Sequence, residues 1–226
     1  MEYLLGYLKS PGPIILNIGP FSIRWYGLLI ALSVLIGLNL SKRLSQKRGI
    51  EKGLIDDLLP YLIFASLIGA RIYYVIFEWS IYKGNLFESF AIWKGGIAIH
   101  GALIGALISI WIFCLFNKQY FWDILDILVP SFALGQSIGR WGNFFNNEAF
   151  GLPTNLPWKI YIPFNYRPIE LVNFDYFHPT FLYESLWNLA IFILLMFIFK
   201  KVSLNKQKIH SGSISIIYLT FYSIGR

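Results

Sequence analysis

The chain alternates long apolar runs with shorter polar segments, and this alternation predicts its fold. The apolar positions are continuous rather than spaced at every second residue, which is typical of helices that cross a bilayer and not of barrel strands. We therefore expect an all-α integral membrane protein, a polytopic helical bundle with six spans in this chain. The expected spans cover residues 22–40, 58–77, 97–116, 124–140, 179–199 and 212–226.

Charge in the polar segments predicts the orientation of the bundle. Segments 41–52 and 200–210 carry an excess of Lys and Arg, whereas segments 78–96 and 140–178 balance basic against acidic residues. Because an excess of Lys and Arg marks cytoplasmic loops, the first two segments are expected inside and the other two outside. With the N-terminus outside, all four segments fall on the side that their charge predicts.

The domain organisation is expected to be simple. A single membrane-embedded domain covers residues 1–226, and segment 141–178, which is rich in Pro, Asn and aromatic residues, forms a cap on the outer side. The last run, 212–226, is shorter than the about twenty residues that a crossing requires. We therefore expect the chain to end inside a transmembrane helix and to be a C-terminally truncated form of a longer protein.

Composition supports the membrane location and excludes several kinds of site. The chain is 56% hydrophobic and 14% charged, whereas a soluble domain carries roughly a quarter charged residues. The single cysteine, Cys114, excludes an internal disulfide and a cysteine-based metal cluster. The histidines lack metal-ligand spacing. We expect no metal, no cofactor and no nucleic-acid partner, and the sequence does not indicate an oligomer.

The strongest candidate for a functional site is segment 139–151, which directly follows an apolar run. Polar groups there would be costly near hydrocarbon, so they are expected to be paired and functional. Arginine combined with asparagine suits recognition of a phosphate or ester oxygen. Three glycines would let the backbone turn sharply or approach a ligand. The polar side chains of the segment are Arg140, Asn143, Asn146, Asn147 and Glu148.

Arg71 lies inside the second expected span, with Tyr74 and Glu78 on the same helical face. Two interpretations remain open for this arginine. One is a structural ion pair with Glu78, and the other is direct contact with a substrate.

His100 opens the third expected span, where an imidazole could accept a proton near neutral pH. The alternative is a hydrogen-bonded packing residue. Gly101 and Gly105, extended by Ser109, form a stripe of small residues that predicts close packing against another helix.

Other polar residues near the span ends are weaker candidates. Tyr26 is typical of an interfacial aromatic belt, and Glu184 would anchor its helix or pair with another polar group. Arg226 would lie near the outer half of the membrane, where Arg140 and His100 are also expected. The polar stripe of the last run consists of Ser215, Tyr218, Tyr222 and Arg226.

Two arginines, a histidine and several amides in the outer half of a bilayer suit an anionic lipid headgroup. At this point the sequence resembles a known family, the bacterial phosphatidylglycerol–prolipoprotein diacylglyceryl transferases. The resemblance covers nearly the whole chain and rests on its motifs in the family's order. These are Arg24-Trp25-Tyr26-Gly27, His100-Gly101-Ala102-Leu103-Ile104-Gly105, Gly139-Arg140-x-Gly142-Asn143-Phe144-x-Asn146-x-Glu148-x-x-Gly151, His178-Pro179-x-x-x-Tyr183-Glu184 and Tyr222-Ser223-Ile224-Gly225-Arg226.

The resemblance implies a fold, a location and a reaction. Members have seven spans and lie in the bacterial cytoplasmic (inner) membrane, with the active site toward the outer leaflet. They transfer diacylglycerol from phosphatidylglycerol to the thiol of the lipobox cysteine of a prolipoprotein. The product is a thioether, glycerol phosphate leaves, and the nucleophile belongs to the substrate. The family continues past Arg226 with a further Glu and Arg and a last span, so we expect the truncated chain to have impaired activity.

The resemblance also implies roles for individual residues. Arg140 and Arg226 would hold the phosphate and stabilise the leaving group, and His100 would accept the cysteine proton. Tyr26 and Tyr222 would donate hydrogen bonds near the ester or phosphate. The residues that would bind or shape the headgroup site are Arg71, Asn143, Asn146, Glu148 and Gly151.

Two other functions compete with this interpretation. A phosphatidyltransferase that uses a CDP-activated lipid would need clustered aspartates around a divalent metal, and the expected outer site has no such cluster. A non-enzymatic anionic-lipid-binding or transport protein would carry paired half-repeats or broken helices, which the sequence lacks. Covalent lipid transfer would exclude the second alternative.

Overall fold

The computed structural model describes residues 7–51, 53–205 and 210–225. The chain divides into two compact units. The first contains Met1–Leu40, Leu128–Ile209 and Ser213–Arg226, and the second contains Ser41–Ile127 and His210–Gly212.

Helices form at all six expected positions. Four of the described helices are long and apolar enough to cross a membrane: α1, α2, α4 and α6 over Thr180–Lys201. The protein is therefore a multi-pass helical membrane protein, and the six-span count stays a prediction because α7 is short and α5 carries several polar residues. The helices are α1 Trp25–Lys47, α2 Leu54–Phe77, α4 Ile99–Phe116, α5 Phe121–Asn146, α6 Thr180–Asn205 and α7 Ser213–Ile224.

Several helix boundaries differ from those expected, among them the start of the first helix and the end of α5. Residues 22–24 belong to strand β3 and not to the first span. Helix α5 continues beyond residue 140 to Asn146. Its aromatic residues at positions 141, 144 and 145 follow helical spacing, so packing extends the helix past the charged and glycine residues.

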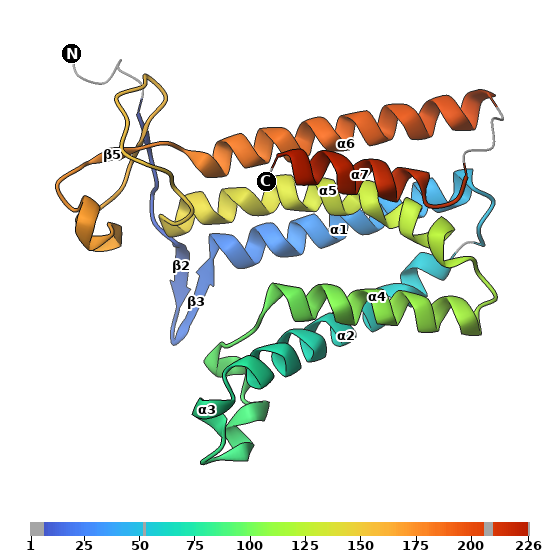
Figure 1. Cartoon of the computed structure of the whole chain (residues 1–226), viewed down its shortest axis with the longest axis horizontal. Helices are drawn as coiled ribbons and strands as arrows, with labels where there is room; N and C mark the ends of the chain where they lie inside the picture. The colour runs from blue at the N-terminus through green and yellow to red at the C-terminus, as the bar shows by residue number, and fades with distance from the viewer. Residues whose placement is uncertain (1–6, 52, 206–209, 226) are drawn as a thin grey trace. The chain divides into compact units, whose positions relative to one another are not determined.

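The second unit is built on the pairing of α2 with α4 (Figure 1). Backbone meets backbone along a seam of small residues formed by Gly69 and Ala65 on α2 and by Gly101 and Gly105 on α4. A Cβ atom at Gly101 would come within 2.8 Å of the Gly69 carbonyl carbon and closer still to its oxygen. The predicted packing stripe is thus confirmed.

Charged residues hold one end of this unit together. Arg48 Nη1 donates to Asp123 Oδ1 at 3.0 Å and also pairs with the fully buried Asp126. Asp126 Oδ2 accepts from the backbone N–H of Gly212 at 2.9 Å. The two aspartates therefore join three segments of the chain.

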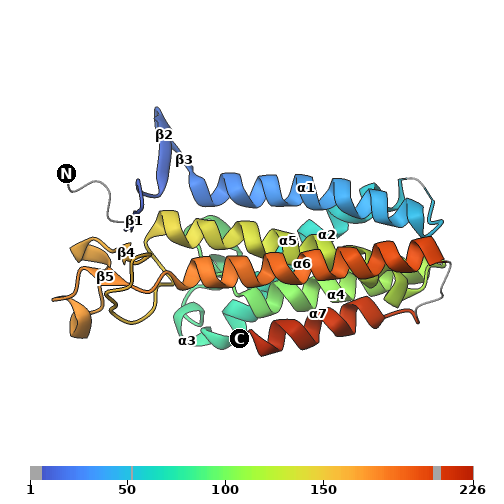
Figure 2. The ribbon, with the colours of Figure 1, turned by 90° about the horizontal axis from the view of Figure 1, so that it is seen from above.

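The first unit contains most of α1 and α5 and all of α6 and α7 (Figure 1, Figure 2), and α6 packs against α7. Two buried serines join α5 to α6 reciprocally. Ser137 Oγ donates to the Ser185 carbonyl at 2.9 Å, and Ser185 Oγ donates to the Ser137 carbonyl at 2.9 Å. Tyr218 of α7 donates its hydroxyl to Gln136 of α5 at 2.8 Å. These bonds set the register of the three helices.

Small β elements lie at the end of this unit that carries segment 139–151. Strand β1 pairs in parallel with β4, and β4 pairs antiparallel with β5. Strands β2 and β3 form a hairpin just before α1. The strands are β1 Leu8–Lys9, β2 Ile14–Ile18, β3 Phe21–Arg24, β4 Ile160–Tyr161 and β5 Tyr176–Phe177.

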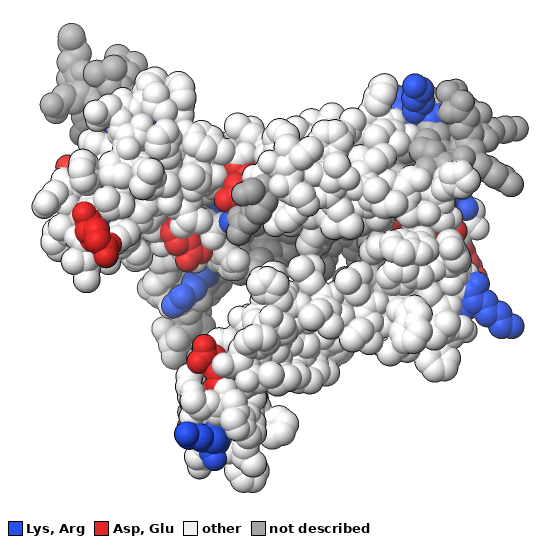
Figure 3. Space-filling view, viewed as in Figure 1, with Lys and Arg blue, Asp and Glu red and all other residues white. Residues whose placement is uncertain are grey.

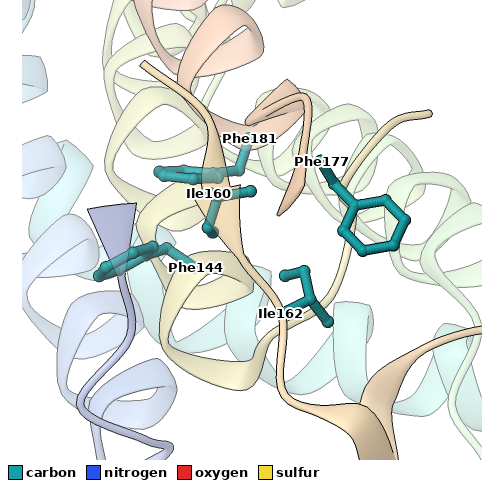
Figure 4. Close-up of a cluster of buried hydrophobic side chains, with 5 residues drawn as sticks. All are labelled: Phe144, Ile160, Ile162, Phe177 and Phe181. Atoms are coloured by element: carbon teal, nitrogen blue, oxygen red, sulfur yellow. The ribbon is translucent and has the colours of Figure 1, made fainter. Parts of the chain in front are cut away.

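A compact apolar cluster packs β4 and β5, together with Leu8 of β1, onto the helices (Figure 4). Its side chains are almost fully buried, so segment 151–178 is anchored to the ends of α5 and α6. The cluster consists of Phe144, Ile160, Ile162, Phe177 and Phe181. By contrast, the visible surface over the middle of α6 is uncharged (Figure 3). Ile193 and Phe197 of this helix are exposed, as a lipid-facing surface requires.

Candidate functional site

The polar residues of segment 139–151 are presented by the last turns of α5 and by the tight turn that follows. Arg140, Asn143 and Asn146 are all helical, and their spacing of three residues places them along one side of the helix. Of the two alternatives for the glycines, a sharp turn or close approach to a ligand, the turn is ruled out at positions 139 and 142, which lie inside the helix, and the approach to a ligand stays a prediction. The chain turns instead at Asn147 and Ala149, whose φ angles are 55° and 53°.

The Glu148 carboxylate accepts hydrogen bonds from the side chains of Asn143 and Asn146. Asn143 Nδ2 donates to Glu148 Oε1 at 2.9 Å, and Asn146 Nδ2 donates to the same oxygen at 3.2 Å. The carboxylate therefore fixes the orientation of both amides, because each must direct its NH₂ group toward Glu148. The expectation that these polar groups are paired is confirmed for Asn143, Asn146 and Glu148, whereas the buried Asn147 Oδ1 atom has no hydrogen-bond partner among the described residues.

Arg140 has a different acidic partner, Glu184 of α6. Its Nη2 atom lies 2.5 Å from Glu184 Oε2, and both side chains are about three-quarters buried. Its Nη1 atom makes a longer contact of 3.4 Å with Asn143 Oδ1. A guanidinium has five N–H donors in a fixed fork, so these two contacts leave other donors available for an anion.

Two glycines of the motif permit close approach of side chains. At Gly142 a Cβ atom would come within 2.7 Å of Cε2 of the Tyr26 ring and closer still to Cδ2, so the tyrosine lies directly against the α5 backbone. At Gly151 a Cβ atom would meet Thr180 at 2.9 Å and His178 at 3.0 Å. Gly151 is also held by a backbone hydrogen bond to the His178 carbonyl at 2.9 Å.

Helix α6 supplies residues that face α7. Glu184, Trp187 and Asn188, spaced by three and four positions, line a small hollow together with Tyr222 and Gly225. Trp187 Nε1 donates to the Phe221 carbonyl at 3.0 Å. Asn188 is buried, and its Oδ1 atom has no hydrogen-bond partner among the described residues. Tyr222 stacks on Tyr218 at 5.6 Å between ring centroids, and Arg226 lies outside the described residues.

Arg71, in the second unit, is bound by backbone carbonyls. Its guanidinium donates to the carbonyl oxygens of residues 88, 89, 95 and 96 at 2.6–2.8 Å, and its side chain is buried. The interpretation as an ion pair with Glu78 is therefore wrong, because carbonyls of the following loop take the donors instead. The proposed contact with substrate stays a prediction.

His100 is exposed at the first turn of α4, with its ring 5.8 Å from that of Tyr73. It belongs to the second unit, whereas Arg140 and Tyr26 belong to the first. The expected convergence of His100 with Arg140 stays a prediction. His178, in the first unit, shares a hydrogen bond of 3.2 Å with the Tyr183 hydroxyl.

The sequence interpretation missed the partnership between Arg140 and Glu184, and it missed Gln136, Trp187 and Asn188 altogether. A signal was present for part of this set, because Glu184, Trp187 and Asn188 follow the spacing of one helical face. Their partners on α5 and α7 depend on helix register, which spacing within α6 does not give.

Comparison with known proteins complements this geometry. The family profile described as prolipoprotein diacylglyceryl transferase matches residues 13–226. The phosphatidylglycerol–prolipoprotein diacylglyceryl transferase of Prochlorococcus marinus (strain NATL2A) is 57% identical over 100% of this chain and 79% of its own length.

Proteins of the same name from Synechococcus sp. (strain CC9902) and Synechocystis sp. (strain ATCC 27184 / PCC 6803 / Kazusa) are also similar to this chain. The first is 61% identical over 96% of this chain and 78% of its own length. The second is 55% identical over 100% of this chain and 80% of its own length.

Proposed function

Because the chain belongs to the prolipoprotein diacylglyceryl transferase family, we propose that the polar cluster at the end of α5 is where it carries out that family's reaction. The chain is a transferase that moves the diacylglyceryl group of phosphatidylglycerol to prolipoproteins. The observation that supports this location best is the coincidence of a conformationally held guanidinium with two oriented amides in one stretch of chain.

Arg140 is proposed to bind the phosphodiester and stabilise the leaving group. As the sulfur forms its bond to the glycerol carbon, the carbon–oxygen bond breaks and the electron pair moves to a phosphate oxygen. A fixed cation beside that oxygen stabilises the charge as it develops. Asn143 and Asn146, oriented by Glu148, shape the headgroup site, and Gly151 permits close approach of the backbone.

The nucleophile is the lipobox cysteine of the prolipoprotein, and His100 is proposed to take its proton. A free thiol has a pKa of about 8.5, so few molecules are ionised at neutral pH without assistance. Tyr26 and Tyr222 are proposed as hydrogen-bond donors near the ester or phosphate, Arg226 as a second phosphate ligand and Arg71 as a further contact to substrate. The Tyr26 ring packs against Gly142, so its phenol lies near the helical turn of α5 that carries Arg140.

The finer topology belongs to the same proposal. The chain contributes six of seven spans as one membrane-embedded domain in the bacterial inner membrane, with its N-terminus outside. Segment 141–178 then covers the outer side, and the site opens toward the outer leaflet. The apolar cluster that includes Phe177 anchors this segment, as expected of a cap that stays in place during turnover.

The test is a mass assay in detergent with phosphatidylglycerol and a lipobox peptide. The 226-residue chain is compared with a version extended at its C-terminus to the length of its relatives. We expect a diacylglyceryl mass gain on the peptide cysteine, lost with Arg140→Ala and kept with Arg43→Ala, which removes an exposed arginine from α1. Phosphatidylglycerol binding without transfer by either folded protein would favour a lipid-binding or transport protein instead.

A further inference from the structure

The ion pair between Arg140 and Glu184 is the closest charged contact of the candidate site. The two atoms are 2.5 Å apart, and the side chains are only 25% and 28% exposed. A pair from which water is largely excluded is stronger than a surface pair, since screening is weaker there. Glu184 is thus able to hold the guanidinium in one orientation.

The surroundings of Glu184 make it a rigid support. The next residue, Ser185, forms the reciprocal hydrogen bonds with Ser137, which lies three positions before Arg140 on α5. On the other side, Asn188 Nδ2 donates to the Glu184 carbonyl at 2.9 Å. The buried hydrogen bonds between Ser137 and Ser185 lie within one helical turn of Arg140 and Glu184, so they set the distance between α5 and α6 at this pair.

We propose that Glu184 is a positioning residue for the transfer: it acts through Arg140 and does not touch the reacting atoms. This inference rests on the proposed role of Arg140 as the phosphate ligand. Glu184 occupies one edge of the guanidinium and leaves its other N–H donors to the phosphodiester. A free arginine side chain would lose about 2 kcal/mol of rotamer entropy when it binds, and the ion pair removes much of that freedom beforehand.

The proposal predicts a specific split between kinetic constants. Glu184 lowers the positive charge that the phosphodiester meets, so its removal strengthens or preserves ground-state attraction. Its removal also releases Arg140 from the aligned geometry, and misplacement by about 1 Å can cost roughly 100-fold in rate. Glu184→Ala should therefore lower kcat about 10- to 100-fold while KM for phosphatidylglycerol stays unchanged or falls.

The experiment is a double-mutant cycle with the mass assay described above. Glu184→Ala is measured alone and in combination with Arg140→Lys, and Glu184→Gln keeps the shape and a neutral acceptor oxygen. Glu170→Ala, an exposed carboxylate on η4 (Ile169–Leu171), serves as the matched control and should leave kcat unchanged. Monodispersity and thermal midpoint establish that each variant is folded.

If Glu184 acts through Arg140, its removal in the Arg140→Lys background should cost far less than in the wild type. Glu184→Gln should retain more activity than Glu184→Ala. Additive losses, or a rise in KM with unchanged kcat, would overturn the positioning role. Absence of transfer by both the 226-residue chain and its extended version would instead reject the proposed function, so the two failures are distinguishable.

Discussion

Substitution of Gly101 by alanine tests whether the seam between α2 and α4 is as tight as the structure describes. The added methyl group would lie within 2.8 Å of the Gly69 carbonyl carbon and closer to the oxygen and to the Tyr73 side chain. The nearest obstacle is backbone, so no rotamer change relieves it. The two helices must separate or shift along each other.

The cost follows from the size of that shift. Separating the backbones by roughly 0.5–1 Å forfeits a quarter to a half of the dispersion attraction of each affected atom pair. Overpacking of this kind costs about 1–3 kcal/mol. At about 2–4 °C per kcal/mol for a chain of this size, the thermal midpoint should fall by roughly 2–12 °C.

The assay is thermal unfolding in a mild detergent, with Gly135→Ala as the control. Gly135 is also a helical glycine, but its nearest neighbour would lie at 3.8 Å, an ordinary van der Waals distance. We expect Gly101→Ala and Gly105→Ala to lower the midpoint and Gly135→Ala to leave it unchanged or raise it slightly, because alanine favours helix. Equal midpoints for Gly101→Ala and Gly135→Ala would refute the reasoning.

Three further substitutions probe other parts of the structure. Ser137→Ala removes the donor of the bond to the Ser185 carbonyl but keeps the Ser137 carbonyl that accepts from Ser185 Oγ, so it should cost about 0.6–1.7 kcal/mol; an SDS titration of unfolding in mixed micelles checks this. Ala149 has a φ of 53°, which glycine adopts without strain. Ala149→Gly should therefore leave the free energy of unfolding equal or raise it by up to about 1 kcal/mol, without loss of transfer activity. Arg71→Met leaves four loop carbonyls without their donor. Limited proteolysis should therefore cut segment 86–96 faster than in the wild type. Equal rates of cleavage would contradict the role of Arg71 in holding this loop.

Much of the architecture could be predicted because lipid imposes simple rules. Apolar runs marked all six helices, and the spacing of Gly101 and Gly105 marked the seam. The end of α5 was predicted too early, because Arg140 and two glycines resemble a loop. The aromatic side chains at positions 144 and 145 could have corrected this, since they continue the helical spacing and pack with the apolar cluster that includes Ile160 and Phe177.

The candidate site was only partly predictable for a different reason. The composition of segment 139–151 identified Arg140 and its neighbours, because charges near hydrocarbon require an explanation. The partner of Arg140 depends on how α5 and α6 are aligned, and that alignment is set by Ser137 and Ser185, two residues without a distinctive pattern. The same holds for Arg71, whose partners are backbone carbonyls that carry no sequence signal.

The parallel pairing of Leu8–Lys9 with Ile160–Tyr161 has a consequence for biosynthesis. Strand β1 leaves the ribosome about 150 residues before its partner, which at 5–20 residues per second means a delay of roughly 8 to 30 seconds. During that interval its backbone groups are unpaired and open to wrong partners, and Lys9, a residue type that discourages edge association, is one of its two residues. The sheet therefore closes late, after most of the helices have been synthesised.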